Sequence, residues 1–224
     1  ITIDADDARY ESGAEQAHVD FAARWSNTYG GWDLGVYHFY GTSREPRLLL
    51  SFDDLGLELV PYYDLIHQTG IDVQYTRGPW LWKFEGIHRS GQNGTFTATA
   101  AGLEYTFFDV KGSGIDVGLL AEYLWDSRGD AGGNAFENDL FLGTRLGFND
   151  EQGTSILAGA IVDLDSGGAL WNLEASRRIG QDWRLTVEAR IFTGFENGGL
   201  LAAGDPLAHL RKDDYIEVQL AWYF

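Results

Sequence analysis

The sequence predicts an all-β protein: a transmembrane antiparallel β-barrel with about 11–12 strands in this chain, either complete or part of a larger barrel. Three observations lead to this prediction. Apolar and polar residues alternate along nearly every segment, the connections between segments alternate between long and short, and no run of about 18 apolar residues provides a membrane-spanning helix. A strand that faces lipid on one side and water on the other needs such alternation.

The last ten residues show the pattern most clearly. One side carries Ile216, Val218, Leu220, Trp222 and Phe224, and the other carries Tyr215, Glu217, Gln219, Ala221 and Tyr223. A soluble sheet rarely leaves such a strand at a terminus, because an exposed apolar edge promotes aggregation. We therefore expect residues 215–224 to be the closing strand of the barrel, with its apolar side toward lipid.

Residues 1–17 are expected to form an outer-loop or N-terminal segment, and residues 18–224 the barrel. Alternation marks eleven strands, at 18–26, 32–37, 71–76, 80–85, 101–107, 115–125, 140–147, 156–163, 169–178, 183–191 and 215–224. Strands of about 9–11 residues cross a bilayer when tilted. Segment 156–163 is apolar on both sides, so its orientation stays open.

The connections sort by length when residue 224 is placed at the periplasmic end. Long connections at 42–70, 126–138 and 194–214 fall on the outer side, and short ones at 27–31, 78–79, 149–154 and 179–182 fall on the periplasmic side. Outer-membrane barrels show this asymmetry, although 90–95 and 164–168 are short outer connections. The long extracellular loop, 42–70, is expected to contain a hairpin, since 48–52 and 57–60 flank a turn-like break.

An odd number of strands raises a question of parity, because single-chain bacterial barrels have even numbers. Segment 2–10 is one candidate for a twelfth strand, but it contains Asp4, Asp6, Asp7 and Arg9, which suit a lipid-facing strand poorly. We favour the alternative that further strands precede this sequence.

Composition excludes some functions. The formal charge of −18 argues against nucleic acid as a partner, because phosphate binding needs a basic surface. The chain has no cysteine, so it has neither a disulfide framework nor a thiolate metal site. No cofactor is implied.

Several segments resemble an uncharacterised porin-like family of outer-membrane β-barrels from Gram-negative bacteria. These segments are GTSREPRLLL (from Gly41), LVPYYDLIHQ (from Leu59), YTRGPWLWKFE (from Tyr75), LLAEYLWDSRGD (from Leu119) and the terminal LRKDDYIEVQLAWYF. The resemblance covers the chain from about Tyr10 onward. It implies location in the bacterial outer membrane, contact with its lipid and lipopolysaccharide, and further strands upstream. It also implies that the strand ending at Phe224 is recognised by the barrel-assembly machinery, and it brings no catalytic residues.

The charged residues that alternate with the apolar ones are the main candidate site. We expect the following to line a pore: Arg24, Asp33, Asp72, Lys83, Glu85, Glu104, Asp116, Glu122, Arg145, Glu174, Arg178, Arg184, Glu188, Arg190 and Glu217. Charged walls set the selectivity of other channels. The alternative is a network of cross-strand ion pairs that fills a narrow barrel.

Other candidates have less support from the sequence. The acidic loops 126–134 and 163–167 contain oxygen ligands but lack the spacing of a Ca²⁺ loop, so we interpret them as solvated turns. His209 lies near carboxylates on an outer connection, where an Asp/His pair could activate water. Segments 44–47 and 61–64 suit either a pore constriction or a rigid hairpin. Tryptophans and tyrosines near the strand ends are expected to form two interfacial girdles.

These observations predict a non-enzymatic outer-membrane barrel that acts as a passive pore for small hydrophilic solutes. One alternative is an outer-membrane portal or scaffold that works with periplasmic export or envelope proteins. A less favoured alternative is a hydrolase at the barrel rim.

Overall fold

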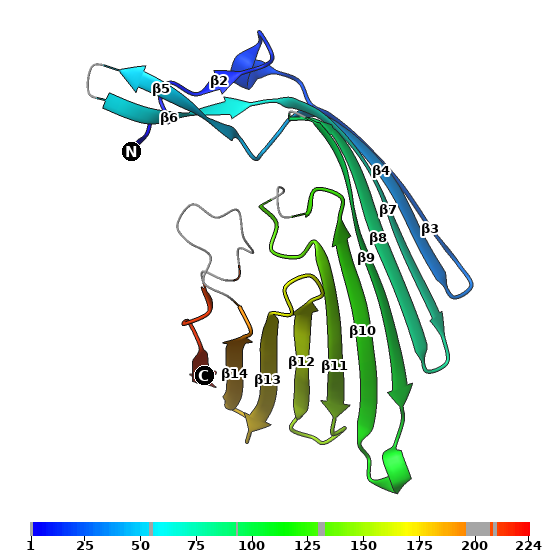
Figure 1. Ribbon diagram of the computed structural model, residues 1–224. Helices are drawn as coiled ribbons and strands as arrows, with labels where there is room; N and C mark the ends of the chain where they lie inside the picture. Colours follow the sequence, from blue (N-terminus) through cyan, green and yellow to red (C-terminus); the bar gives the residue numbers. More distant parts are fainter. Residues whose placement is uncertain (1, 54–55, 93, 130–132, 196–206, 208–209) are drawn as a thin grey trace.

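The computed structural model describes residues 2–53, 56–92, 94–129, 133–195, 207 and 210–224. Its main feature is a twisted and curved antiparallel sheet of eleven strands (Figure 1). These are β3 (Phe21–Tyr29), β4 (Trp32–Thr42), β7 (Leu65–Arg77), β8 (Trp80–Gly91), β9 (Gly94–Phe107), β10 (Asp116–Asp126), β11 (Asn138–Gly147), β12 (Ser155–Asp163), β13 (Ala169–Ile179), β14 (Trp183–Thr193) and β15 (Tyr215–Trp222). The prediction of an all-β chain with eleven strands in one antiparallel sheet is confirmed.

Each strand of this sheet pairs with its neighbours in chain order, except that β4 pairs with β7. β3 and β15 are the two edges of the sheet, so the part of the chain that the structure describes forms an open sheet and not a closed barrel. Several strands are longer than alternation predicted. β7 begins at Leu65 and β9 at Gly94, because polar and small residues continue the pairing beyond the apolar cores of these strands.

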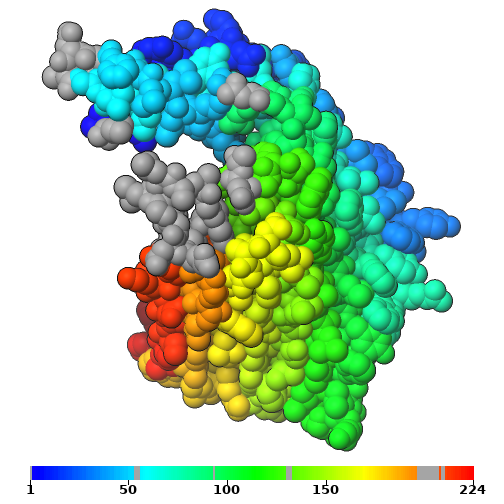
Figure 2. Space-filling model, in the orientation of Figure 1, coloured from blue at the N-terminus to red at the C-terminus, as the bar shows by residue number. Residues whose placement is uncertain are grey.

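A small second sheet is built around a hairpin that lies between β4 and β7 in the sequence. The hairpin of β5 (Arg47–Asp53) and β6 (Gly56–Tyr63) is joined by β1 (Thr2–Ile3) and β2 (Arg9–Tyr10), which pair in parallel with β6. Figures 1 and 2 show that it projects beyond the strand ends of the main sheet. We call this the loop end of the sheet, and the opposite end, with the tight β3–β4 and β7–β8 connections, the turn end.

The structure corrects one expectation about these segments and decides against one less favoured alternative. The 42–70 connection is shorter than predicted, because Thr42 and Leu65 are paired within the main sheet and the hairpin occupies most of what lies between. The hairpin itself is confirmed. Segment 2–10 is not a twelfth strand of the main sheet, since its two short strands pair with β6, and the turn-forming Asp4 accepts hydrogen bonds from the backbone of Asp6 and Asp7.

The cross-strand register gives the main sheet two faces of opposite character. We define the apolar face as that of Ile71, Ala121 and Val187, and the polar face as that of Asp72, Glu122 and Glu188. On the apolar face Val36 pairs with Ile71, Val117 with Leu146, and Val187 with Val218. The same register orients β12, which the sequence left ambiguous: Ile156, Ala158, Ala160 and Val162 lie on the apolar face.

Large apolar side chains on this face are exposed. Leu142 is 53% exposed, Trp82 49% and Ile216 74%. In the described part of the chain, the buried hydrophobic residues are few: Val60, Ile66, Ala160, Ala169 and Leu207. Among the residues that the structure describes, no second layer therefore packs on the apolar face of the main sheet.

Tight connections hold the turn end together. Gly30 follows β3 and Gly78 follows β7, each as the first residue of a two-residue turn and each with positive φ, 58° and 57°. Glycine adopts this conformation without a steric penalty from Cβ.

The β9–β10 connection contains a short 3₁₀ helix, η2 (Val110–Gly112), and a second one, η1 (Glu15–Ala17), precedes β3. Within the described ranges, no helix has the length and apolar character needed to cross a membrane.

Candidate functional site

The polar face brings together every residue of the predicted pore lining. Asp72 pairs with Glu85, Lys83 with Gly102, and Glu122 with both Gly102 and Phe141. The same face carries Arg24, Asp33, Glu104, Asp116, Arg145, Glu174, Arg178, Arg184, Glu188, Arg190 and Glu217. None of these side chains is fully buried. That they line a pore stays a prediction.

Glycines also gather on the polar face. They are Gly35, Gly41, Gly70, Gly91, Gly94, Gly102, Gly118, Gly143, Gly147 and Gly159, whereas Gly86 lies on the apolar face. Larger side chains use the space that these glycines leave. The Tyr37 ring covers its partner Gly70, and the Phe141 ring lies over both Gly143 and Gly159.

Two ion pairs on the polar face each cross a middle strand at a glycine. Arg24 on β3 reaches Asp72 on β7 at 2.8 Å, passing over Gly35 of β4. A Cβ atom on Gly35 would lie 2.4 Å from the Asp72 Oδ2 atom.

The second pair repeats this arrangement. Glu104 on β9 and Arg145 on β11 meet at 3.1 Å across Gly118 of β10. A Cβ atom on Gly118 would lie 3.0 Å from the Glu104 Oε1 atom. Glycine at these positions therefore lets charges two strands apart pair.

The β13–β15 end of the polar face is acidic. Glu174 pairs with Glu188, and Glu188 pairs with Glu217, so three carboxylates stand side by side on adjacent strands. Asn172 donates a hydrogen bond to Glu174 at 3.1 Å. Like charges directly opposite one another destabilise a sheet. This row therefore does not add to the stability of the sheet through its own pairing.

A cavity of about 480 Å³ opens at the loop end of the polar face. Its walls include Phe96, with the guanidinium of Arg128 at 3.7 Å from the ring centroid and that of Arg89 at 5.3 Å. Asp126 accepts hydrogen bonds from Arg128 Nε and Nη2. These bonds raise the pKa of Arg128, which keeps the group charged. Glu45 accepts from Arg89 Nη1 at 3.1 Å and completes the charged lining.

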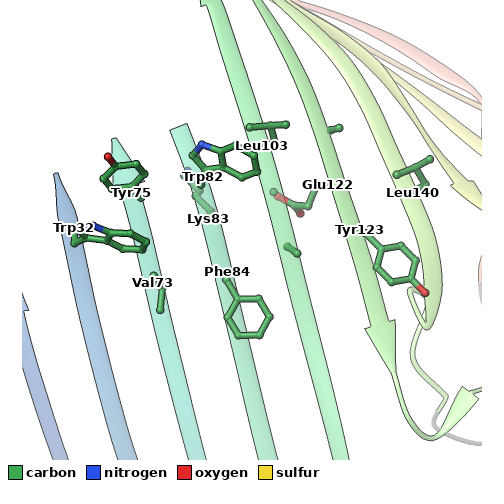
Figure 3. A pocket seen from close by; sticks show the side chains of 13 residues that line it. Trp32, Val73, Tyr75, Trp82, Lys83, Phe84, Leu103, Glu122, Tyr123 and Leu140 are labelled. Atoms are coloured by element: carbon green, nitrogen blue, oxygen red, sulfur yellow. The ribbon is translucent and has the colours of Figure 1, made fainter. Parts of the chain in front are cut away.

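The apolar face has a hollow of about 750 Å³ that extends from Trp32 and Tyr75 on β4 and β7 to Tyr123 and Leu140 on β10 and β11. Figure 3 shows Trp82, Phe84 and Tyr123 among the side chains that line it. The small residues Ala101 and Ala121 also line the hollow, and larger side chains on neighbouring strands surround them. The hollow follows from this alternation of small and large residues on one face.

Aromatic rings lie at both ends of the apolar face. At the turn end Trp32 stacks on Tyr75 with 4.4 Å between centroids, and Trp183 stacks on Trp222 at 5.8 Å. At the loop end Tyr40 stacks on His67 at 4.5 Å.

Histidines extend the aromatic band at the loop end. His38 and His88 each form a 2.9 Å hydrogen bond with a threonine on the neighbouring strand, Thr69 and Thr97 respectively. The sequence did not predict this histidine band, because β7 and β8 extend further than their apolar cores indicated.

The acidic connections form capped turns. Asp163 accepts backbone hydrogen bonds from Asp165 and Ser166, and Asp126 pairs with Arg128. In the β11–β12 turn, Asp150 accepts from the hydroxyl and the backbone N–H of Thr154, and these bonds lower the pKa of Asp150. Across the described ranges, histidine and acidic side chains form no group of three or more that could hold a metal ion. His209 lies outside the residues that the structure describes.

The loop-end cavity was missed by sequence reasoning. Arg89 and Phe96 face each other across β8 and β9 on the polar face, and alternation along β8 indicates the inward position of Arg89 but not the cavity. Alternation within the predicted strands does not give the positions of Arg128 and Glu45, because both lie outside those strands.

No protein-family model matches the chain, and neither a curated protein nor a solved structure matches it. The resemblance to a porin-like family therefore stays a prediction.

Proposed function

We propose that this chain forms the wall of an outer-membrane β-barrel whose polar face lines a passive channel for small hydrophilic solutes. One observation carries the proposal: a single large sheet has an exposed apolar face on one side and a charged face on the other. Burying a large apolar side chain fully gains about 1.5–3 kcal/mol, and the exposed side chains of this face forgo much of that gain in water. Hydrocarbon on the apolar side removes this cost.

The open edges of the sheet set a requirement on the proposal. Lipid contains no groups that satisfy backbone N–H and C=O, so sheet edges do not stay open in a bilayer. The free edges of β3 and β15 must therefore be paired in the membrane, either with each other or with further strands. Both solutions keep Asp72 and Glu188 inside and Ile71 and Val187 outside.

The aromatic residues at both ends of the sheet support the proposal that it spans the membrane. Trp32, Tyr75, Trp183 and Trp222 at the turn end suit the interface between lipid and water, as does Tyr40 at the loop end. In this proposal the loop end faces the lipopolysaccharide leaflet and the turn end faces the periplasm. The exposed Phe224 ring and the free edge of β15 are available to the barrel-assembly machinery.

The polar face suggests a preference for cations. Of the fifteen predicted lining residues, nine are acidic and six are basic. Charges of one sign in a narrow aqueous path raise the local concentration of the opposite ion. The row of Glu174, Glu188 and Glu217 concentrates this effect on one side of the lumen.

Planar-bilayer recording tests the proposal. We expect stepwise conductance and, under a KCl gradient, a reversal potential that shows preference for K⁺. The triple change Glu174→Gln, Glu188→Gln and Glu217→Gln should reduce this preference. The matched control neutralises three acidic residues outside the main sheet, Asp4, Asp6 and Asp7, and should leave the preference unchanged. A folded, membrane-inserted protein without conductance would refute the channel.

A further inference from the structure

We propose that the loop-end cavity binds the carboxylate group of a small organic acid, held by the guanidinium groups of Arg89 and Arg128. The assignment rests on the proposed channel, because the cavity would then lie at the outer mouth of the lumen, apart from the acidic row of Glu174, Glu188 and Glu217 at the middle of β13–β15. A volume of about 480 Å³ is within the usual range of about 300–1,000 Å³ for small-molecule sites.

Both guanidinium groups lie over the ring of Phe96. Arg128 lies at 3.7 Å from the ring centroid and Arg89 at 5.3 Å, so both cations gain from the ring's electron density. Gln68 also accepts a hydrogen bond from Arg89 Nε at 2.8 Å, which orients that guanidinium. A planar guanidinium with several N–H donors matches the two oxygens of a carboxylate. The guanidinium N–H groups of Arg89 and Arg128 are thus oriented before a ligand binds.

The acidic partners of the two arginines differ in a way that permits exchange. The Asp126 side chain is 1% exposed and accepts hydrogen bonds from both Nε and Nη2 of Arg128, so it holds that guanidinium in one position. The Glu45 side chain is 75% exposed and reaches Arg89 through one 3.1 Å contact. An exposed ion pair adds little to stability, so a solute carboxylate can replace Glu45 at low cost.

The backbone of Glu45 is held while its carboxylate projects into water. The Glu45 N–H donates to the Ser43 hydroxyl at 3.2 Å, and its carbonyl accepts from the Gln92 side chain. The side chain can therefore leave Arg89 without movement of the connection. Glu45 acts as an internal competitor. The incoming carboxylate takes its place as the negative charge beside Arg89.

The rest of the cavity favours an acid with a small apolar body. Ile87 and Ala98 pair across β8 and β9 directly beside Arg89 and Phe96, and both line the cavity. They offer hydrocarbon contact next to the charged groups. Benzoate fits this description, and benzamide has the same shape without the charge.

Equilibrium binding of benzoate to the full chain in lipid nanodiscs, followed by saturation-transfer NMR, tests the assignment. We expect benzoate to bind and benzamide not to bind. Arg89→Gln should weaken benzoate binding by about tenfold or more, the usual loss for one charge-assisted hydrogen-bonded contact. Glu45→Gln should strengthen it several-fold, because the internal competitor loses its charge.

Opposite effects of the two variants separate a binding site from a structural ion pair. Arg145→Gln, on the same face but paired with Glu104, is the matched control and should leave benzoate affinity unchanged. If Arg89→Gln does not fold, Arg89→Lys provides a second test. It keeps the positive charge but loses the planar set of N–H donors, so it should also weaken benzoate binding. Equal affinity for benzoate and benzamide, or no gain in Glu45→Gln, would overturn the assignment. Conductance without benzoate binding refutes this site alone, and binding without conductance refutes the channel alone.

Discussion

Arginine substitution at two neighbouring leucines of β10 gives the sharpest test of which face meets lipid. Leu119 lies on the apolar face, pairs with Tyr105 and Thr144, and is 49% exposed. Leu120 lies on the polar face, where its direct partners are Glu104 and Gly143. The two positions share strand, residue type and depth, and differ in the face they occupy.

The expected costs follow from the surroundings of each face. An arginine on the lipid side of a barrel costs about 2–4 kcal/mol near the midplane and less toward the interfaces. Leu119 is two residues from Ala121, the midpoint of β10, so we expect Leu119→Arg to cost about 2 kcal/mol or more. Leu120→Arg places the cation beside Glu104 and should cost about 1 kcal/mol or less.

Reversible guanidinium unfolding in lipid vesicles, followed by tryptophan fluorescence, measures both costs. Unchanged slopes of the unfolding curves would show that the two variants unfold to comparable states. If water covered the apolar face, Leu119→Arg would act as an ordinary surface change, within about 0.5 kcal/mol. A cost for Leu119→Arg no larger than that for Leu120→Arg would therefore refute the lipid-facing assignment.

Two further predictions concern the glycine crossing and a turn. Gly35→Val should destroy the ion pair that crosses β4 and cost about 1–3 kcal/mol, because its Cβ would lie 2.4 Å from the Asp72 carboxylate. Gly86→Val, whose Cβ meets neighbours at 3.4 Å or more, is the control, and equal losses in vesicle unfolding would contradict the collision. Asp150→Ala should destabilise the protein most above about pH 5, because the hydrogen bonds from Thr154 lower the folded pKa of Asp150 below its unfolded value of about 3.9. Acid-unfolding titrations of both proteins should therefore converge as the pH falls, and a pH-independent difference would contradict this assignment.

Much of the polar face could be predicted from local pattern. Side chains of a strand alternate with a period of two, so Glu188 and Glu217 must face away from Val187 and Ile216 whatever partners the strands find. The same rule placed all fifteen charged candidates on one face. It could not orient β12, where Leu157 and Ile161 are as apolar as their neighbours, until pairing with β11 and β13 decided.

Contacts between distant residues could not be predicted in this way. Arg24 and Asp72 are 48 positions apart, and nothing near either one shows that Gly35 leaves room for them to meet. Arg128 and Phe96 come together because the chain just after β10 continues beside β9, where the Ser127 N–H donates to the Thr97 carbonyl. Such contacts depend on register and on the paths of loops, which local alternation does not specify.

By itself, the sequence determined the approximate positions of eleven alternating strands, the composition of each face and the excess of negative charge, because these follow from the order of residues along the chain. Only the tertiary structure decided the pairing of β4 with β7 around the hairpin, the ion pairs that cross at Gly35 and Gly118, and the cavity around Phe96. The physical reason is that alternation is a property of one strand, whereas a site on a sheet is made by side chains from several strands whose register is set by pairing across the whole sheet.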